Sequence, residues 1–99
     1  MSGVDDILEF AAAPHSLPGA ERSDAVRLLG DTLAVGAAAV GAPGEDAIVS
    51  VARQWGKGDE ARLIGTGERL PATSAAFVNG YRFHCLEWDA VHEPAVVHA

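Results

Sequence analysis

The sequence of 99 residues has little cysteine and little positive charge. Its one cysteine, Cys85, has no partner for an internal disulfide, so a reducing compartment is expected. The 7 lysine and arginine residues are outnumbered by 14 aspartate and glutamate residues, which gives a net charge of −7 without any basic run. Such a chain repels phosphate groups, so neither a nucleic acid nor an anionic membrane surface is expected as a partner.

The sequence also lacks a long apolar run and a basic leader. Its most apolar stretch, Leu33 to Pro43, is far shorter than the roughly 20 residues that cross a bilayer. The first residues, Met-Ser-Gly-Val-Asp-Asp, are acidic, whereas a secretory signal begins with a basic patch. We therefore expect a cytoplasmic protein that does not span a membrane.

What the sequence does contain is typical of a folded helical protein. Its residues are 48% hydrophobic and 21% charged, which is ordinary for a globular domain. We predict one all-helical (all-α) domain over residues 1–99, in the form of a helical bundle fragment. Apolar side chains recur at helical spacing in four segments. These segments are about Val4–Ala12, Ala20 or Ser23 to Val40, Glu45–Trp55 and Pro71–Asp89.

Two segments interrupt the helical pattern. Ala61–Ile64 lies among four glycines and predicts a short strand or an extended connector. Val91 to Pro94 predicts a loop, because Pro94 disfavours a helical conformation at Glu93.

The fourth predicted helix is apolar on nearly all sides, with Phe77, Tyr81, His84 and Trp88 along one face. A helix of this kind is normally buried in a larger body than four short helices can form. The apolar ending up to Ala99 has no capping residue. We therefore expect these residues to be the amino-terminal part of a larger domain, covered by more protein or by a second subunit.

Ionisable side chains gather in the final stretch of the sequence. They are His84, Glu87, Asp89, His92, Glu93 and His98. A carboxylate at a helix end, followed by histidines on a loop, suits general acid/base chemistry, which requires such groups on a rigid element. The alternative is a helix end that carries solvated polar groups and does no chemistry, and the spacing alone does not separate the two.

Other interpretations of this stretch are weaker. His84 with Glu87, and Asp89 with His92, have a spacing that can share a metal on a helix, but no complete metal-binding motif is present, so no metal is expected. Cys85 beside His84 would point about 100° away from it on a helix, which favours a buried structural cysteine over a nucleophile. Elsewhere in the chain, the glycine-rich turn Gly65-Thr66-Gly67 lacks the other residues of a phosphate-binding loop.

Three runs of residues resemble a known family. They are Leu70-Pro71-Ala72-Thr73-Ser74-Ala75-Ala76-Phe77-Val78-Asn79-Gly80, then His84-Cys85-Leu86-Glu87-Trp88-Asp89, and finally His98. Together they are similar to the amino-terminal region of the MmgE/PrpD family, the 2-methylcitrate dehydratase-like and cis-aconitate decarboxylase-like proteins. The segment from Ala25 to Leu33 resembles the first long helix of that family.

This resemblance implies a function and a set of site residues. The activity would be that of a lyase or isomerase on small di- or tricarboxylic acids, by proton transfer next to a carboxylate, without a metal or other cofactor and usually as a homodimer. Asp89 and His98 match the family's catalytic aspartate and histidine, and His84 matches a supporting histidine. His92 and Glu87 are further candidates for binding or support.

The sequence departs from the family pattern at Glu87, Trp88, Ala90 and Ala99, where Asp, Phe, Asp and Pro are common. The family's further catalytic Lys, His and Tyr have no counterpart within these 99 residues, and no Lys or Arg follows Arg82 to neutralise a polycarboxylate. We therefore expect the isolated chain to be inactive. The competing hypothesis is a non-catalytic helical interaction or oligomerisation module.

Overall fold

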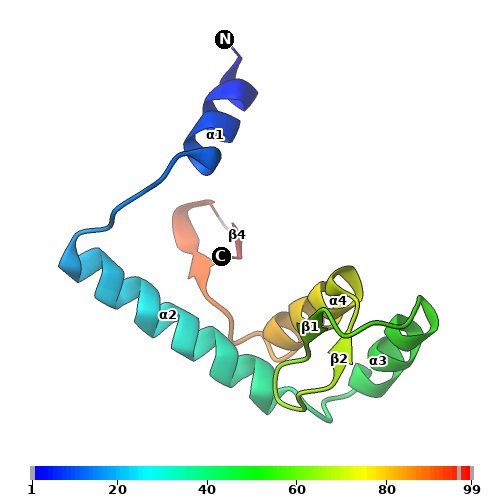
Figure 1. The fold of residues 1–99 in the computed structure, drawn as a ribbon. Helices are drawn as coiled ribbons and strands as arrows, with labels where there is room; N and C mark the ends of the chain where they lie inside the picture. The colour runs from blue at the N-terminus through cyan, green and yellow to red at the C-terminus, as the bar shows by residue number, and fades with distance from the viewer. Residues whose placement is uncertain (1, 96, 99) are drawn as a thin grey trace.

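The computed structural model describes residues 2–95, 97 and 98, with His92, Glu93 and His98 described through their backbone alone. It contains the helices α1 (Gly3–Ala12), α2 (Gly19–Ala38), α3 (Glu45–Gln54) and α4 (Ala72–His84) (Figure 1). Two antiparallel strand pairs accompany them: β1 (Ala61–Arg62) with β2 (Arg69–Leu70), and β3 (Val91–His92) with β4 (Val97–His98). A 3-10 turn, Glu93–Ala95, joins β3 to β4. The predicted all-α fold with a short strand at Ala61 is confirmed.

Local hydrogen bonds and a glycine explain where α1 and α3 begin. At α1, the Asp5 N–H donates to the Ser2 hydroxyl, and the Asp5 carboxylate accepts from the Ser2 N–H at 3.0 Å, which completes a capping box. The Ser2 N–H and then the Ser2 hydroxyl, by donating to the Asp5 carboxylate, lower its pKa. Before α3, Gly44 has a φ of 85°, and a Cβ there would lie 2.8 Å from the Tyr81 hydroxyl, so glycine fits both the backbone and the space.

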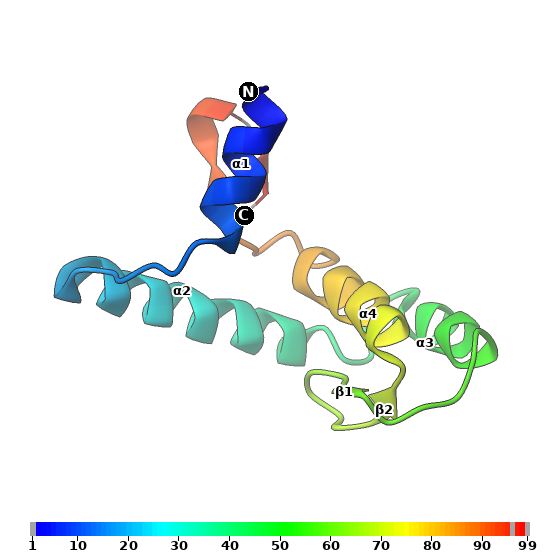
Figure 2. The ribbon, with the colours of Figure 1, turned by 45° about the horizontal axis from the view of Figure 1, so that its top comes forward.

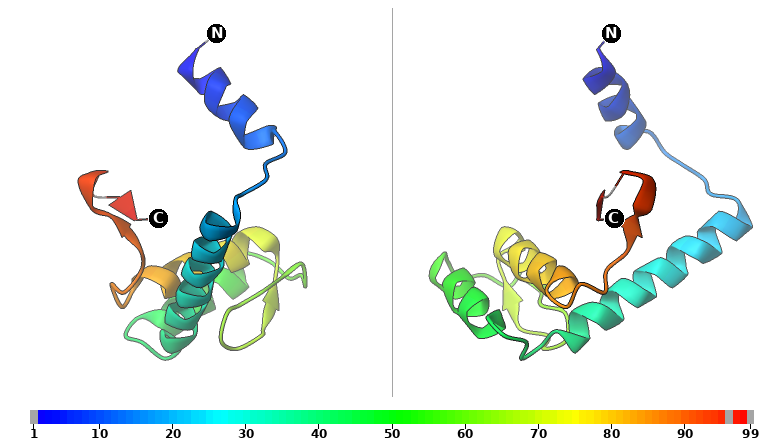
Figure 3. Two further views of the ribbon diagram at one scale, coloured as in Figure 1. Left: turned by 90° about the vertical axis from the view of Figure 1, so that its left-hand side faces the viewer. Right: turned by 180° about the vertical axis from the view of Figure 1, so that it is seen from behind.

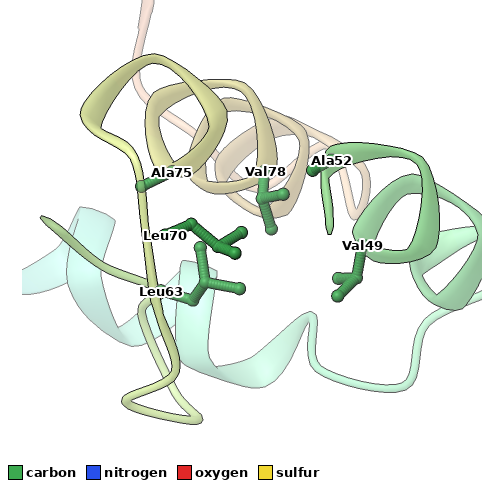
Figure 4. Packing of buried hydrophobic residues seen from close by; sticks show 6 residues of the cluster. All are labelled: Val49, Ala52, Leu63, Leu70, Ala75 and Val78. Atoms are coloured by element: carbon green, nitrogen blue, oxygen red, sulfur yellow. The ribbon is translucent and has the colours of Figure 1, made fainter. Parts of the chain in front are cut away.

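The hydrophobic core lies between α3, α4 and the β1–β2 pair. Val49 and Ala52 come from α3, Ala75 and Val78 from α4, and Leu63 and Leu70 from the strand segment (Figure 4). Helix α4 packs against both α3 and α2. It therefore lies at the centre of the packed half of the chain.

A close approach of α2 to α4 depends on a glycine. Gly36 is buried in α2, and a Cβ at this position would lie 2.7 Å from Cδ1 and Cε1 of the Phe83 ring. The small residues in the second half of α2 therefore allow α4 to pack closely against it.

A buried ion pair joins α3 to α4. The side chains of Arg82 and Glu45 are only 2% and 4% exposed, and the Arg82 Nε donates to Glu45 Oε1 at 2.7 Å. Arg82 also donates to the Ile64 carbonyl at 2.6 Å, and Glu45 Oε2 accepts from the Gly41 N–H at 3.3 Å. The pair thus holds both helices and the strand segment to one another.

The Asn79 side chain makes a second polar connection. Its carboxamide oxygen accepts from the Ile64 N–H at 2.9 Å, and its nitrogen donates to the Arg62 carbonyl at 3.0 Å. Asn79 therefore satisfies two backbone groups that have no other strand beside them. This Asn of the Asn79-Gly80 pair is a structural residue.

The other half of the chain is open. Helix α1 has no buried residue and stands away from the packed half in both views of Figure 3. The side chains of Ile7, Leu8, Leu28 and Leu29 are all exposed. The radius of gyration is 16.1 Å, whereas a compact domain of about 100 residues has one near 13 Å. Figure 2 shows α2 extending well beyond the packed half. Among the described residues, no helix combines the length and the apolar character that crossing a membrane requires.

Two predictions about the C-terminal third are wrong. Helix α4 ends at His84, five residues before the predicted Asp89, and Val91 and His92 form a strand where a loop is predicted. The buried face of α4 consists of Ser74, Ala75, Val78 and Arg82, while Phe77 and His84 are exposed. Phe77 instead contacts Trp55, with 4.8 Å between the two ring centroids.

We predict that Arg82→Leu lowers the free energy of unfolding by about 3–5 kcal/mol, because it leaves the Glu45 carboxylate buried without its partner. Arg27→Leu is the control: Arg27 pairs with Asp24 on the surface, so its loss should cost less than about 1 kcal/mol. The double variant Glu45→Leu/Arg82→Leu should recover part of the lost free energy of unfolding, as measured by unfolding in urea. A double variant less stable than Arg82→Leu would contradict this interpretation.

Two glycines of α2 should respond in opposite directions to alanine. Gly36→Ala should destabilise the protein by about 1–3 kcal/mol, because the new methyl group overlaps the Phe83 ring. Gly30→Ala places its methyl group where no atom lies within 4 Å, so it should stabilise the helix by about 0.5–1 kcal/mol. Thermal unfolding of the two variants beside the parent measures both effects, and equal shifts would disprove the close contact.

Candidate functional site

The candidate site begins where α4 ends and the chain reverses. The carbonyl of His84, the last residue of α4, accepts a hydrogen bond from the Glu87 N–H at 2.7 Å. Glu87 has a φ of 58°, and no other non-glycine residue in the described part of the chain has a positive φ. The left-handed conformation costs an L-residue roughly 1–2 kcal/mol. It turns the chain so that Asp89 comes back toward the helix end.

This reversal brings His84 and Asp89 into contact. The Nδ1 atom of His84 lies 3.1 Å from Oδ1 and 3.3 Å from Oδ2 of Asp89. The Asp89 side chain is 8% exposed, whereas that of His84 is 52% exposed. A mostly buried carboxylate therefore holds an accessible imidazole on a helix end, an arrangement suited to proton transfer.

The other predicted site residues lie nearby along the chain. Glu87 occupies the turn and is exposed. His92 belongs to β3 and His98 to β4, and the backbone register pairs His92 with Val97 and His98 with Val91. The side chains of His92 and His98 lie outside the described residues. Of the three predicted side chains that the structure describes, it brings together two, His84 and Asp89.

Metal binding gains no support from the described residues. They contain no group of three or more His, Cys, Asp or Glu side chains arranged to hold a metal ion. The spacings of His84 with Glu87 and of Asp89 with His92 belong to no helix, because α4 has already ended. Cys85 is half-buried, with its Sγ 3.9 Å from the Arg82 carbonyl oxygen. This placement agrees with a structural cysteine.

A surface hollow of about 350 Å³ lies over the buried ion pair. No pattern in the sequence predicts it. It is lined in part by Glu45, Arg53, Glu68 and Arg82. Arg53 donates twice to the Glu68 carboxylate, at 2.7 and 2.8 Å, which lowers the pKa of Glu68 and raises that of Arg53. Since these charges pair within the chain, we interpret the hollow as part of the scaffold.

Two features of the chain are now established: a helical scaffold and a contact between His84 and Asp89 at the end of α4. The family model of the MmgE/PrpD N-terminal domain matches residues 8–99 of this sequence. The chain belongs to the MmgE/PrpD family, as the resemblance in its sequence indicates. Neither a curated protein nor a solved structure matches it significantly.

We predict that substitutions at Glu87 follow the demands of its left-handed backbone. Glu87→Val should lower the free energy of unfolding by about 1–2 kcal/mol more than Glu87→Gly, because a β-branched side chain is especially unfavourable at positive φ. The same pair of substitutions at Glu9, within α1, should show the reverse order, because glycine is the poorer helix former. Urea unfolding of the four variants would measure the difference, and a common order at both positions would refute the turn geometry.

Proposed function

We propose that this chain forms part of a lyase or isomerase that acts on small di- or tricarboxylic acids. The reaction transfers a proton to or from a carbon next to a carboxylate, as in a 2-methylcitrate dehydratase-like enzyme. The observation that carries the proposal is the contact between Asp89 and His84, in a chain that belongs to the MmgE/PrpD family. We expect His98 to join this site and His92 and Glu87 to support it.

The charges of the chain limit what it can do alone. A polycarboxylate requires cationic partners, and Arg and Lys are the side chains that bind carboxylates most strongly. Arg82 is the nearest cation along the sequence to His84, and it is occupied by Glu45. We propose that the substrate's charges are neutralised by other residues of the assembled enzyme, with no metal or other cofactor.

The same proposal covers the assembly and its location. Exposed apolar side chains such as Ile7, Leu8 and Leu29 are better covered than left in water. A homodimer of the complete enzyme would cover such surface. With its single, unpaired Cys85 we expect the enzyme to work in the reducing cytoplasm.

A non-catalytic assembly module is the second candidate function. It is favoured by α1, which has no buried residue, and by the exposed apolar side chains of α2. This function would need no acid/base pair. Turnover of any small carboxylic acid by the natural protein would decide against it.

We predict that Asp89→Asn lowers turnover of the natural protein by at least about 100-fold, because the pair loses its negative charge. Proton NMR of a panel of di- and tricarboxylic acids would identify the substrate and then measure the rate. Asp24→Asn, an exposed carboxylate on α2, is the matched control and should leave the rate unchanged. Near-normal turnover in Asp89→Asn would rule out its role.

A further inference from the structure

Helix α1 is amphipathic, and its apolar face is exposed. Val4, Ile7 and Leu8 recur at helical spacing on this face, and all three are exposed. The acidic side chains of the helix, such as Glu9, lie on its other side and stay in water when the apolar face is covered. Helix α1 contains no Lys or Arg, the side chains that hold an amphipathic helix on a lipid surface, so its apolar face suits a protein surface better.

The first half of α2 carries an apolar face that α1 could cover. Val35 and Gly36 are buried in the second half of α2, which packs against α4. Leu28 and Leu29 lie seven residues earlier, nearly two turns, and therefore on the same face of the helix. Their side chains are 56% and 59% exposed. The face that is packed in the second half of α2 thus continues as an exposed apolar surface in the first half.

The linker between the two helices, residues 13–18, keeps α1 from folding back onto its own α2. Ala13 and Leu17 each precede a proline, which restricts them to extended conformations. Ala13 and Pro18 accordingly have ψ angles of 147° and 158°. Figure 1 shows the linker drawn out between the two helices, with α1 standing away from α2.

The linker is also fixed to the end of α1. Nε2 of His15 lies 2.6 Å from the Phe10 carbonyl oxygen, and the centroids of the two rings are 4.4 Å apart. A tight reversal at this end of the linker would break both contacts. Helix α1 and its linker therefore project from the rest of the chain as an arm.

We propose that two copies of this protein exchange their arms, so that α1 of each copy packs on the Leu28–Leu29 face of the other. The exchange covers both exposed faces at once. Because each copy gives one arm and receives one, the assembly closes at two copies. The inference rests on the homodimer of the proposed function and names the surfaces through which its two chains meet.

Disulfide cross-linking of the natural protein tests the exchange. Coexpressed Leu8→Cys and Leu29→Cys variants with different tags should form a disulfide between their chains under mild oxidation, which peptide mass spectrometry identifies. Leu8→Cys with Ser23→Cys is the control and should form none, because Ser23 is exposed on the opposite side of α2. No link between positions 8 and 29 would overturn the exchange, as would a Leu8→Cys/Leu29→Cys double variant that links only within one chain.

The dissociation constant of the dimer gives a second readout. Leu8→Glu should raise Kd by at least about 10-fold in analytical ultracentrifugation, because it places a charge in the apolar contact. Glu9→Gln, on the polar side of the same helix, should leave Kd unchanged. A dimer whose Kd is unchanged in Leu8→Glu would overturn the exchange alone. A monomeric natural protein would overturn the homodimer and the exchange together, while turnover of a carboxylic acid tests the proposed reaction separately.

Discussion

The buried contact between Glu45 and Arg82 determines how the packed half of the chain fits together. Each charge loses its hydration on folding, so each must find its partner and further hydrogen bonds for the fold to be favourable. Arg82 meets this requirement by reaching both Glu45 and the Ile64 carbonyl, and Glu45 also accepts from Gly41. An alternative packing of α3 against α4 would leave a charge buried alone, so the pair favours a single arrangement over its competitors.

The same contact supports the candidate site. Arg82 precedes His84 by two residues, and Asn79 and Tyr81 add hydrogen bonds to the strand segment and to the Pro43 carbonyl. The last turn of α4 is therefore held by side-chain hydrogen bonds as well as by apolar packing. A side chain that takes part in catalysis requires support of this kind, which agrees with the function proposed for the site.

The helices of this fold could be predicted from the sequence, but their buried faces could not. Apolar spacing is a local signal, and α1, α2 and α3 agree with it within a few residues, whereas α4 ends five residues early. Which face is buried depends on distant partners: Arg82 enters the core only because Glu45 is there to receive it. The available signal for this buried face was Arg82, which lies on the same face of α4 as Ala75 and Val78.

The proximity of the candidate residues along the chain was predictable, and the geometry of their contact was not. The clustering of His84 and Asp89 is visible in the sequence, but their contact requires the helix to end between them. Glu87 adopts a left-handed conformation that glycine or asparagine usually marks, so its identity gave no warning of the turn. Glu87 therefore forms the turn that brings His84 and Asp89 together, although its residue type does not indicate a turn.

The pair at the end of α4 is local in sequence, and this has a consequence for how the protein folds. His84 and Asp89 are five residues apart, so closing the segment between them costs little chain entropy compared with a contact between distant elements. The Glu45–Arg82 contact spans 37 residues and must form across a much longer loop. Contacts closed by short segments form sooner than contacts closed by long ones. The turn at Glu87 can therefore be in place before α3 and α4 dock, so the His84–Asp89 contact does not have to wait for the core to assemble.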